Sequence, residues 1–422
     1  MLNKISLECI DCKKNYPYHR KEYRCDCGNL LEVKQDFTSY GQEILQKFQK
    51  RLEQLQLPLS SGVWRYKELV LDIPENNIVS RNEGNTNLYD SKILSGYTKI
   101  KNLKIKHEGE NPTGSFKDRG MTSAISMAKY LGYKSVACAS TGNTSASMAS
   151  FAATCGLQSY VFIPDGDIAY GKLSQALAYG GKTIQIKGNF DDAMDMVQKV
   201  CSELDIYLLN SINPYRIEGQ KSIVIELMHQ LNWNPPNWIV LPGGNLGNTS
   251  AFGKAIKELY GIGLISKIPR LAVIQAQGAN PFYEMISKKE NSISSMEPHT
   301  IASAIKIGNP VSWKKAKNSI DYTGGVVDQL SEKKIMDAKA YVDKSGIGAE
   351  PASCCSIGGA KKLREKGIIK EDESVVCILT GNILKDTDST INYHMKENNE
   401  MSNKPIKVDC DFEKIKNLIK MK

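Results

Sequence analysis

From about residue 98 onward, apolar and polar positions follow two alternating patterns that predict strands and helices in turn. Short apolar or alternating runs such as NWIVL and KSVACAS are typical of strands, whereas longer runs with apolar residues three or four positions apart are typical of helices. The predicted strands are 102–107, 134–140, 159–164, 182–187, 237–242, 270–276 and 374–380. The predicted helices are 115–131, 144–155, 171–179, 190–204, 217–231, 249–261, 329–344 and 352–365.

Regular alternation of this kind predicts an α/β fold with parallel sheets that are covered by helices on both faces. Ligands of such folds bind at the carboxyl ends of the strands. The chain has 422 residues, of which 41% are hydrophobic, and this length favours two packed domains over a single core.

The two ends of the chain depart from the central pattern. Residues 1–34 form a head with cysteines in CIDC and CDCG, and 40–57 have the spacing of a helix that ends at Pro58. The stretch 384–404 is polar and predicts a connector, and 411–422 predicts a small amphipathic docking helix. Residues 391–422 are therefore assigned to a polar connector and C-terminal helix.

Lys117, in the run ENPTGSFKDRGM, lies between a turn and the start of a predicted helix. The positive end of the helix dipole disfavours a charged amine there. This position suits an amine that must be neutral to attack a carbonyl, although most lysines are simply solvated surface residues.

Two further loops carry glycine between a predicted strand and a predicted helix, STGNTSAS at 140–147 and LPGGNLGNTS at 241–250. Such turns present backbone N–H groups to an anion, although many contain glycine for backbone reasons only. Neither loop has the spacing of a Walker or dinucleotide-binding motif. A lysine amine with a phosphate cradle, and without a redox or nucleotide motif, suggests pyridoxal phosphate.

The segments HEGENPTGSFKDRGM, ASTGNTSAS, LPGGNLGNTSAFGK and CILTGN resemble, in this order, conserved segments of the threonine synthases. These are pyridoxal-phosphate enzymes of the tryptophan-synthase-β group. NSINPYRIEGQKS, AIKIGNPVSW and GIGAEPASCCSIGG extend the resemblance over about residues 60–390. Dehydratases and related lyases share the lysine segment, but its combination with NPYRIEGQ and IGNPVSW is much more specific.

The resemblance implies a fold-type II pyridoxal-phosphate core over 35–390, in which a smaller domain of roughly 130–215 is inserted in a larger one. It also implies a homodimer. The implied reaction converts O-phospho-L-homoserine and water to L-threonine and phosphate, the last step of threonine biosynthesis.

The resemblance also implies roles for individual residues. Lys117 would hold the cofactor as a Schiff base and shuttle protons at Cα and Cβ, Asn143 would bond the phenolic oxygen, and Thr380 would face the pyridine nitrogen. The cradle for the cofactor phosphate would consist of Gly244, Asn245, Leu246, Gly247 and Asn248. The substrate's carboxylate and phosphate would be bound by Ser140, Thr141, Thr144, Lys172, Asn210 and Arg216.

Two loops depart from the family pattern: GNTNL at 84–88 replaces GNTPL, and TGNILKD at 380–386 replaces TGHGLKD. Ile383 cannot adopt a positive φ at low cost where glycine could, so the second loop must bend in another way. These changes bear on substrate selectivity.

Two other functions compete with the implied one. The first is a related pyridoxal-phosphate enzyme, either a Ser/Thr dehydratase or a β-replacing synthase that uses O-phosphoserine. The second is a non-enzymatic descendant that uses its head as an interaction module. Arg216 with Lys172 favours a phosphorylated substrate, and the intact Lys117 argues against loss of activity.

Composition and charge exclude several other classes of protein. The net charge of +9 is spread along the chain rather than clustered with aromatic residues, so we expect no nucleic-acid partner. No run of 18 apolar residues is present, and the N-terminus lacks an apolar signal core, so we expect neither a membrane span nor secretion. Eleven scattered cysteines do not resemble a disulfide framework and favour a reducing cytoplasm.

The head resembles a zinc ribbon, with Cys9 and Cys12 in one knuckle and Cys25 and Cys27 in the other. Four thiolates suit tetrahedral zinc. The second knuckle is one residue shorter than the usual CxxC, and a small metal-free β subdomain is the alternative.

Overall fold

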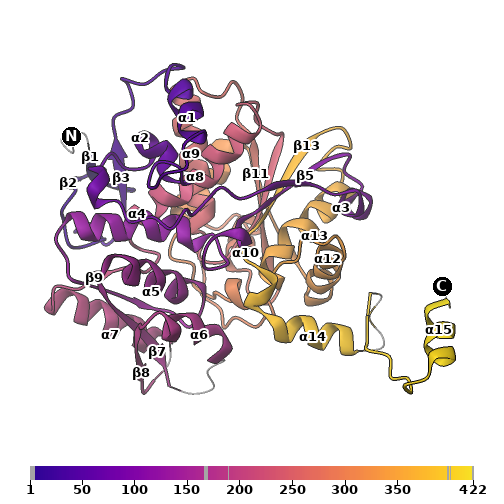
Figure 1. Cartoon of the computed structure of the whole chain (residues 1–422). Coiled ribbons are helices and arrows are strands. Elements are labelled where there is room, and N and C mark those ends of the chain that lie inside the picture. The colour runs from indigo at the N-terminus through magenta and orange to yellow at the C-terminus, as the bar shows by residue number, and fades with distance from the viewer. Residues whose placement is uncertain (1–4, 166–169, 189, 397–398, 400, 421–422) are drawn as a thin grey trace.

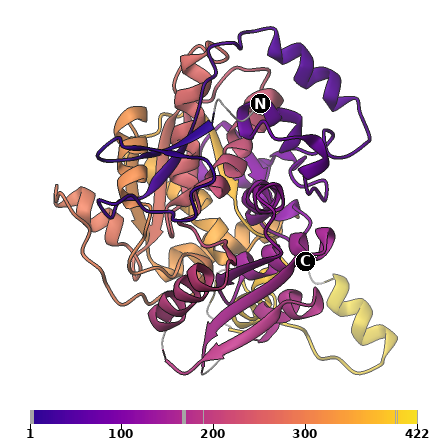
Figure 2. The ribbon, with the colours of Figure 1, turned by 90° about the vertical axis from the view of Figure 1, so that its left-hand side faces the viewer.

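The computed structural model describes residues 5–165, 170–188, 190–396, 399 and 401–420, without the side chains of 170–172 and 190. These residues contain three β-sheets (Figures 1 and 2). The largest sheet has the strand order β12 (Val326–Leu330), β11 (Arg270–Ala276), β10 (Trp238–Pro242), β13 (Ser374–Leu379), β5 (Asn102–His107) and β4 (Leu88–Asp90). Its strands pair in parallel except at the β4 edge, which is antiparallel.

A second sheet has the order β8 (Lys182–Ile186), β7 (Gln158–Pro164), β6 (Ser135–Ala139) and β9 (Tyr207–Leu208), and all its pairings are parallel. It lies at the lower edge of the molecule in both views. Its strands come from the part of the chain in which the smaller domain is predicted, and the domain boundaries themselves remain a prediction.

The helices that cover the two parallel sheets alternate with their strands. The described helices are α1 (Ile44–Leu52), α2 (Lys67–Val70), α3 (Lys92–Thr98), α4 (Lys117–Tyr130), α5 (Asn143–Cys155), α6 (Tyr170–Ala178), α7 (Phe190–Glu203), α8 (Pro214–Gln230), α9 (Gly247–Gly261), α10 (Pro281–Ser287), α11 (Trp313–Thr323), α12 (Glu332–Lys344), α13 (Pro351–Glu365), α14 (Thr387–Met395) and α15 (Phe412–Lys420). None of the helices in the described part of the chain is both long and apolar enough to cross a membrane.

Strand periodicity explains how the six-stranded sheet is buried on both faces. Ile239 and Leu241 of β10 pack into one core cluster, while Trp238 and Val240 of the same strand pack into a second one. Successive side chains of a strand point to opposite faces, so an entirely apolar strand such as WIVLP requires a layer of helices on each side. Figure 1 shows α8 and α9 on one side of this sheet and α12 and α13 on the other.

The head forms an antiparallel sheet with the order β2 (Asn15–Pro17), β1 (Ile5–Cys9) and β3 (Leu31–Gln35). Its inward-facing residues Leu7, Leu31 and Val33 are completely buried and belong to the same core cluster as Phe252 of α9. The head is therefore packed into the body of the protein.

Several predicted elements are wrong in their extent. The helix predicted at 329–344 begins only at Glu332, because β12 occupies the residues before it, and the helix predicted at 40–57 is limited to α1. The supposed connector 384–404 contains α14, and β4, α3, α10 and α11 were not predicted at all. These missed elements are short or polar, and short segments carry too few periods to reveal their structure.

Candidate active site

A cavity of about 1080 Å³ is lined by the loops that follow β5, β6, β10 and β13. Parallel strands end at one edge of each sheet, so these loops meet although they are far apart in sequence. The cavity contains every predicted cofactor residue, namely Lys117, Asn143, Gly244, Asn245, Leu246, Gly247, Asn248 and Thr380. It also contains five of the six predicted substrate residues, namely Ser140, Thr141, Thr144, Asn210 and Arg216. The side chain of the sixth, Lys172, lies outside the described residues.

Lys117 is the first residue of α4 and lies half-buried in the wall of the cavity. Burial, followed by the positive charge of Arg216, lowers the pKa of its amine to about 7, against the opposing effect of the Glu350 carboxylate. The amine is therefore neutral in a large fraction of molecules near neutral pH. Such an amine can act as a nucleophile and can both accept and return a proton.

The two residues after Lys117 anchor the start of α4. The Asp118 carboxylate accepts hydrogen bonds from the Thr113 backbone (2.7 Å) and hydroxyl (2.6 Å). The completely buried Arg119 donates to Glu108 (2.6 and 2.8 Å) and to Glu226 (2.8 Å), and thereby ties α4 to the end of β5 and to α8. Fully paired buried charges of this kind fix geometry, so the position of Lys117 is set before any ligand enters.

The loop after β10 presents its backbone to the cavity. Leu246 has a φ of 63°, and α9 begins at the next residue, so the first N–H groups of α9 have no acceptor within the helix. A Cβ on Gly244 would lie 3.1 Å from Ile305 Cα, so glycine allows the close packing of this turn. Free N–H groups at the start of a helix whose first residues line the cavity fit the phosphate of pyridoxal phosphate.

Two polar pairs involve residues that line the cavity, Thr380 in one and Asn143 with Glu350 in the other. Thr380 directly follows β13, and its hydroxyl lies 2.9 Å from the hydroxyl of Ser353 on α13. The Asn143 amide donates to the Glu350 carboxylate at 3.3 Å. Burial raises the pKa of Glu350 to about 7, although Asn143, Lys385 and Lys117 oppose this effect. Glu350 was not predicted as a site residue, although a carboxylate directly before the proline that begins α13 is an unusual feature of an otherwise apolar segment.

The predicted substrate residues fall into two groups. Arg216 is buried with one guanidinium nitrogen, Nη1, donating to the Leu209 carbonyl (3.0 Å), and its Nε has no partner. Burial lowers the pKa of this guanidinium to about 10, which leaves it charged. Asn210 differs, because its amide both donates to and accepts from the backbone of Ala139 at 3.0 Å. Arg216 therefore brings a positive charge to the wall of the cavity, whereas the Asn210 amide already holds β6.

Of the two departures from the family pattern, TGNILKD lines the cavity, whereas GNTNL lies behind it and contacts the lining residue Glu110. Asn382 accepts a hydrogen bond from the Leu384 backbone (2.9 Å), and the chain turns through a short 3₁₀ helix beginning at Ile383. This confirms that the loop bends without a positive φ at Ile383. The turn brings Lys385 into the cavity, where it donates to Gln175 of α6. Asn87 in GNTNL supplies a backbone N–H to Glu110 (2.7 Å) that proline could not donate.

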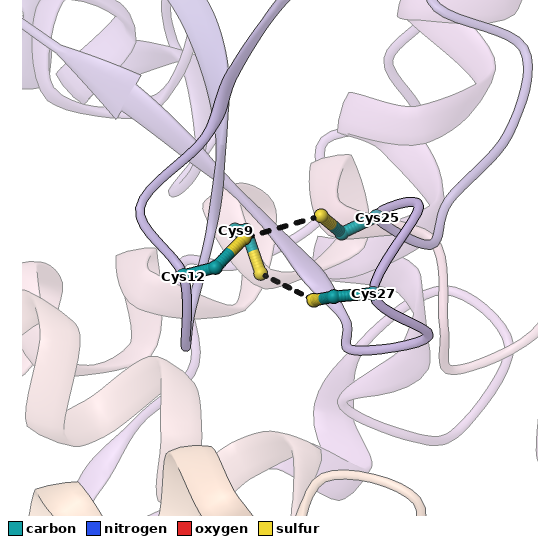
Figure 3. A group of neighbouring side chains, drawn as sticks. All are labelled: Cys9, Cys12, Cys25 and Cys27. Atoms are coloured by element: carbon teal, nitrogen blue, oxygen red, sulfur yellow. Dashed lines mark hydrogen bonds between the residues drawn. The ribbon is translucent and has the colours of Figure 1, made fainter.

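The head brings its four cysteines together (Figure 3). The sulfur atoms of Cys9 and Cys27 lie 3.5 Å apart and those of Cys12 and Cys25 lie 3.4 Å apart, and all four lie within 4.8 Å of one another. Tetrahedral zinc with Zn–S distances of about 2.3 Å requires sulfur separations of about 3.8 Å. The shortened second knuckle therefore does not prevent four sulfur atoms from converging, and the donor set fits zinc.

Comparisons with known proteins identify the family of this chain. Residues 79–381 match the family of pyridoxal-phosphate dependent enzymes. The chain is 46% identical to the threonine synthase of Methanocaldococcus jannaschii and 42% identical to that of Methanosarcina acetivorans, each over 98% of both chains. Its fold is similar to that of the Escherichia coli threonine synthase, with a TM-score of 0.71 over 92% of this chain and 90% of that one at 16% identity.

The family match over residues 79–381 defines the chain as a pyridoxal-phosphate-dependent enzyme. The identity to the two archaeal threonine synthases extends over the head as well as the core. This extent assigns the chain to the threonine synthases within the pyridoxal-phosphate-dependent enzymes. The chain belongs to the threonine synthase family of pyridoxal-phosphate-dependent enzymes.

Proposed function

We propose that this protein converts O-phospho-L-homoserine and water to L-threonine and phosphate. The observation that carries the proposal is the shared cavity of Lys117, the glycine loop and Arg216. It combines a neutral amine, a phosphate cradle and a buried cation with an unpartnered N–H. The curated relatives that carry the name of this activity match the chain over nearly its whole length.

The cofactor would be held by Lys117 through its amine, by residues 244–248 through the phosphate, and by Asn143 and Thr380 at its ring. Bound pyridoxal phosphate supplies an electron sink next to the substrate's α carbon. Thr380 offers a hydroxyl rather than a carboxylate toward the ring, and such a partner leaves a weaker sink. Ser140, Thr141 and Thr144 lie in the turn between β6 and α5, where hydroxyls and helix N–H groups would bind the substrate's carboxylate.

The net reaction requires one hydrogen to leave Cβ and one to arrive at Cγ, while the proton removed from Cα returns there. Water supplies the hydroxyl of Cβ and a proton for the departing phosphate. Lys117, once released from the cofactor, is the group that moves these protons, since a pKa of about 7 allows it to act as base and as acid.

Arg216 would bind the departing phosphate, because it lines the cavity as a charged guanidinium, which suits a dianionic group. Lys385 adds a second cation to the cavity, and burial lowers its pKa. Lys172, on α6, is assigned the same role from the sequence alone. A dehydratase acting on unphosphorylated serine or threonine would have no use for these cations.

The experiment that tests the function is phosphate release from O-phosphohomoserine, O-phosphoserine and threonine, measured side by side with formation of keto acid. We expect rapid phosphate release with O-phosphohomoserine and threonine as the product. Preferred turnover of O-phosphoserine would indicate a β-replacing synthase, and keto acid formed from threonine would indicate a dehydratase.

We further propose that the four cysteines of the head hold one zinc ion, on the basis of the converging sulfur atoms. The proposed assembly is a homodimer, which rests on the family resemblance. The proposed location is the cytoplasm, since eleven cysteines without a disulfide suit a reducing compartment.

A further inference from the structure

A single lysine of the body contacts both cysteine knuckles of the head. Lys314 Nζ donates to Asp11 Oδ2 and to Asn29 Oδ1, each at 2.8 Å. Asp11 lies between Cys9 and Cys12, and Asn29 donates its own amide to Cys27 Sγ at 3.4 Å. Lys314 can make both contacts only while the two knuckles keep their separation, which is the separation that a shared metal ion would fix (Figure 3).

The helix that carries Lys314 begins against the phosphate-binding loop. α11 starts at Trp313, and the two preceding residues, Val311 and Ser312, donate their backbone N–H groups to the side chain and to the carbonyl of Asn245, both at 3.4 Å. The Ser250 hydroxyl of α9 lies 3.5 Å from the Ser312 carbonyl. Only two residues therefore separate Val311, which bonds the loop, from Lys314, which bonds the head.

Neighbouring contacts make this connection stiff rather than adjustable. Lys315 donates to the Leu31 carbonyl of β3 (2.7 Å), and Lys254 of α9 donates to the Val33 carbonyl (2.5 Å). Cys9 of the head and Leu246 of the loop belong to the same buried apolar cluster. A packed interior transmits a displacement instead of absorbing it.

We propose that Lys314 is a positioning residue that couples metal binding in the head to cofactor binding in the active site, through α11 and Asn245. Loss of the metal releases the two knuckles, so Lys314 loses one or both acceptors and the start of α11 becomes less ordered. The loop must then be ordered by the cofactor itself, which lowers cofactor affinity. This inference rests on the proposed zinc site and is independent of the substrate.

The test is equilibrium dialysis of the holoenzyme against a series of pyridoxal phosphate concentrations, with and without a zinc chelator. In the wild type we expect chelation to raise the dissociation constant of the cofactor about fivefold or more, the lower end of typical coupling between sites. Lys314→Ala should show the weaker binding even with zinc present, and chelation should add little to it. Lys314→Arg, which keeps a cation able to reach both oxygens, should restore the wild-type values.

Lys317→Ala is the matched control. Lys317 lies on the same helix, its side chain is 38% exposed against 39% for Lys314, and it bonds only Asp321 on its own helix (2.6 Å). Lys317→Ala should have the wild-type dissociation constant for the cofactor both with and without the zinc chelator. Because coupling is reciprocal, cofactor should also tighten zinc binding in the wild type and not in Lys314→Ala.

Three results would overturn the inference, and they differ from one another. Zinc that leaves without changing cofactor affinity would show that the sites are independent. An equal response to chelation in the wild type and in Lys314→Ala would show that the coupling bypasses Lys314. A protein that takes up no zinc would overturn the metal site together with the coupling, while phosphate release at saturating cofactor would still report on the proposed reaction.

Discussion

The substitution Arg216→Lys distinguishes two possible roles of Arg216, binding of the substrate phosphate and support of the local structure. Arg216 lines the cavity and uses Nη1 to hold the Leu209 carbonyl at 3.0 Å. Lysine retains the charge but concentrates its donors on one nitrogen. It therefore cannot hold Leu209 and bind a phosphate in the geometry of the guanidinium.

The expected loss follows from the hydrogen bonds that are given up. A hydrogen bond to a charged group contributes about 1.5–3 kcal/mol, which converts to about a 10- to 150-fold decrease in kcat/KM. The loss should be specific to phosphorylated substrate, and the visible absorbance of bound cofactor should not change, because Arg216 lies outside the proposed cofactor cradle.

The assay is phosphate release under kcat/KM conditions, with cofactor absorbance recorded on the same samples. Arg65→Lys is the control, since Arg65 is also buried, also bonds a backbone carbonyl (Ser60, 3.0 Å) and also has an unpartnered Nε, but lies outside the cavity. It should retain the wild-type kcat/KM. Equal losses in the two variants, or a loss of cofactor along with activity in Arg216→Lys, would refute the assignment and make Arg216 a structural residue.

Three further predictions address the cofactor, the buried carboxylate and the head. Lys117→Ala should abolish covalent attachment of the cofactor, so that borohydride treatment followed by mass spectrometry finds no adduct on the chain; a labelled adduct on another lysine would contradict the assignment of Lys117. Burial raises the pKa of the Glu350 carboxyl from 4.5 to about 7 in the folded state. Between pH 4.5 and pH 7 the folded protein therefore holds a proton on Glu350 that the unfolded chain has lost. The free energy of unfolding of the wild type consequently falls as the pH rises through this range. In the cofactor-free protein Glu350→Gln should therefore be more stable than wild type at pH 8, by up to about 3 kcal/mol, and by clearly less at pH 5, as measured by urea unfolding; an equal difference at both pH values would exclude this origin. The head should carry about one zinc ion per chain, with Cys9, Cys12, Cys25 and Cys27 unreactive toward a thiol reagent until a chelator is added; freely reactive thiols and no zinc by elemental analysis would favour a metal-free subdomain.

Much of the fold and site could be predicted because the signals are local. The apolar run before residue 243 and the glycines after it are enough to place a buried strand, a turn and a helix start in that order. Parallel strands then bring such turns together at one edge of each of the two sheets, and the cavity lies where these edges meet, so it is lined by Lys117, Asn143 and Thr380. The same reasoning failed for β4 and α3, which are three and seven residues long and show too little periodicity.

The sequence by itself determined the chemistry of this protein: an amine at a helix start, glycine turns that can bind phosphate, and four thiols in two knuckles. Which partners these groups meet depends on the packing of the folded chain. Glu350 and Lys385 reach the cavity from more than two hundred residues beyond Lys117, and the Asn210 amide is taken up by Ala139. Lys314 likewise joins the head to the phosphate loop across nearly three hundred residues. Periodicity and turn chemistry act between near neighbours in the chain, whereas contacts of this kind depend on how separate layers pack, and no local pattern encodes them.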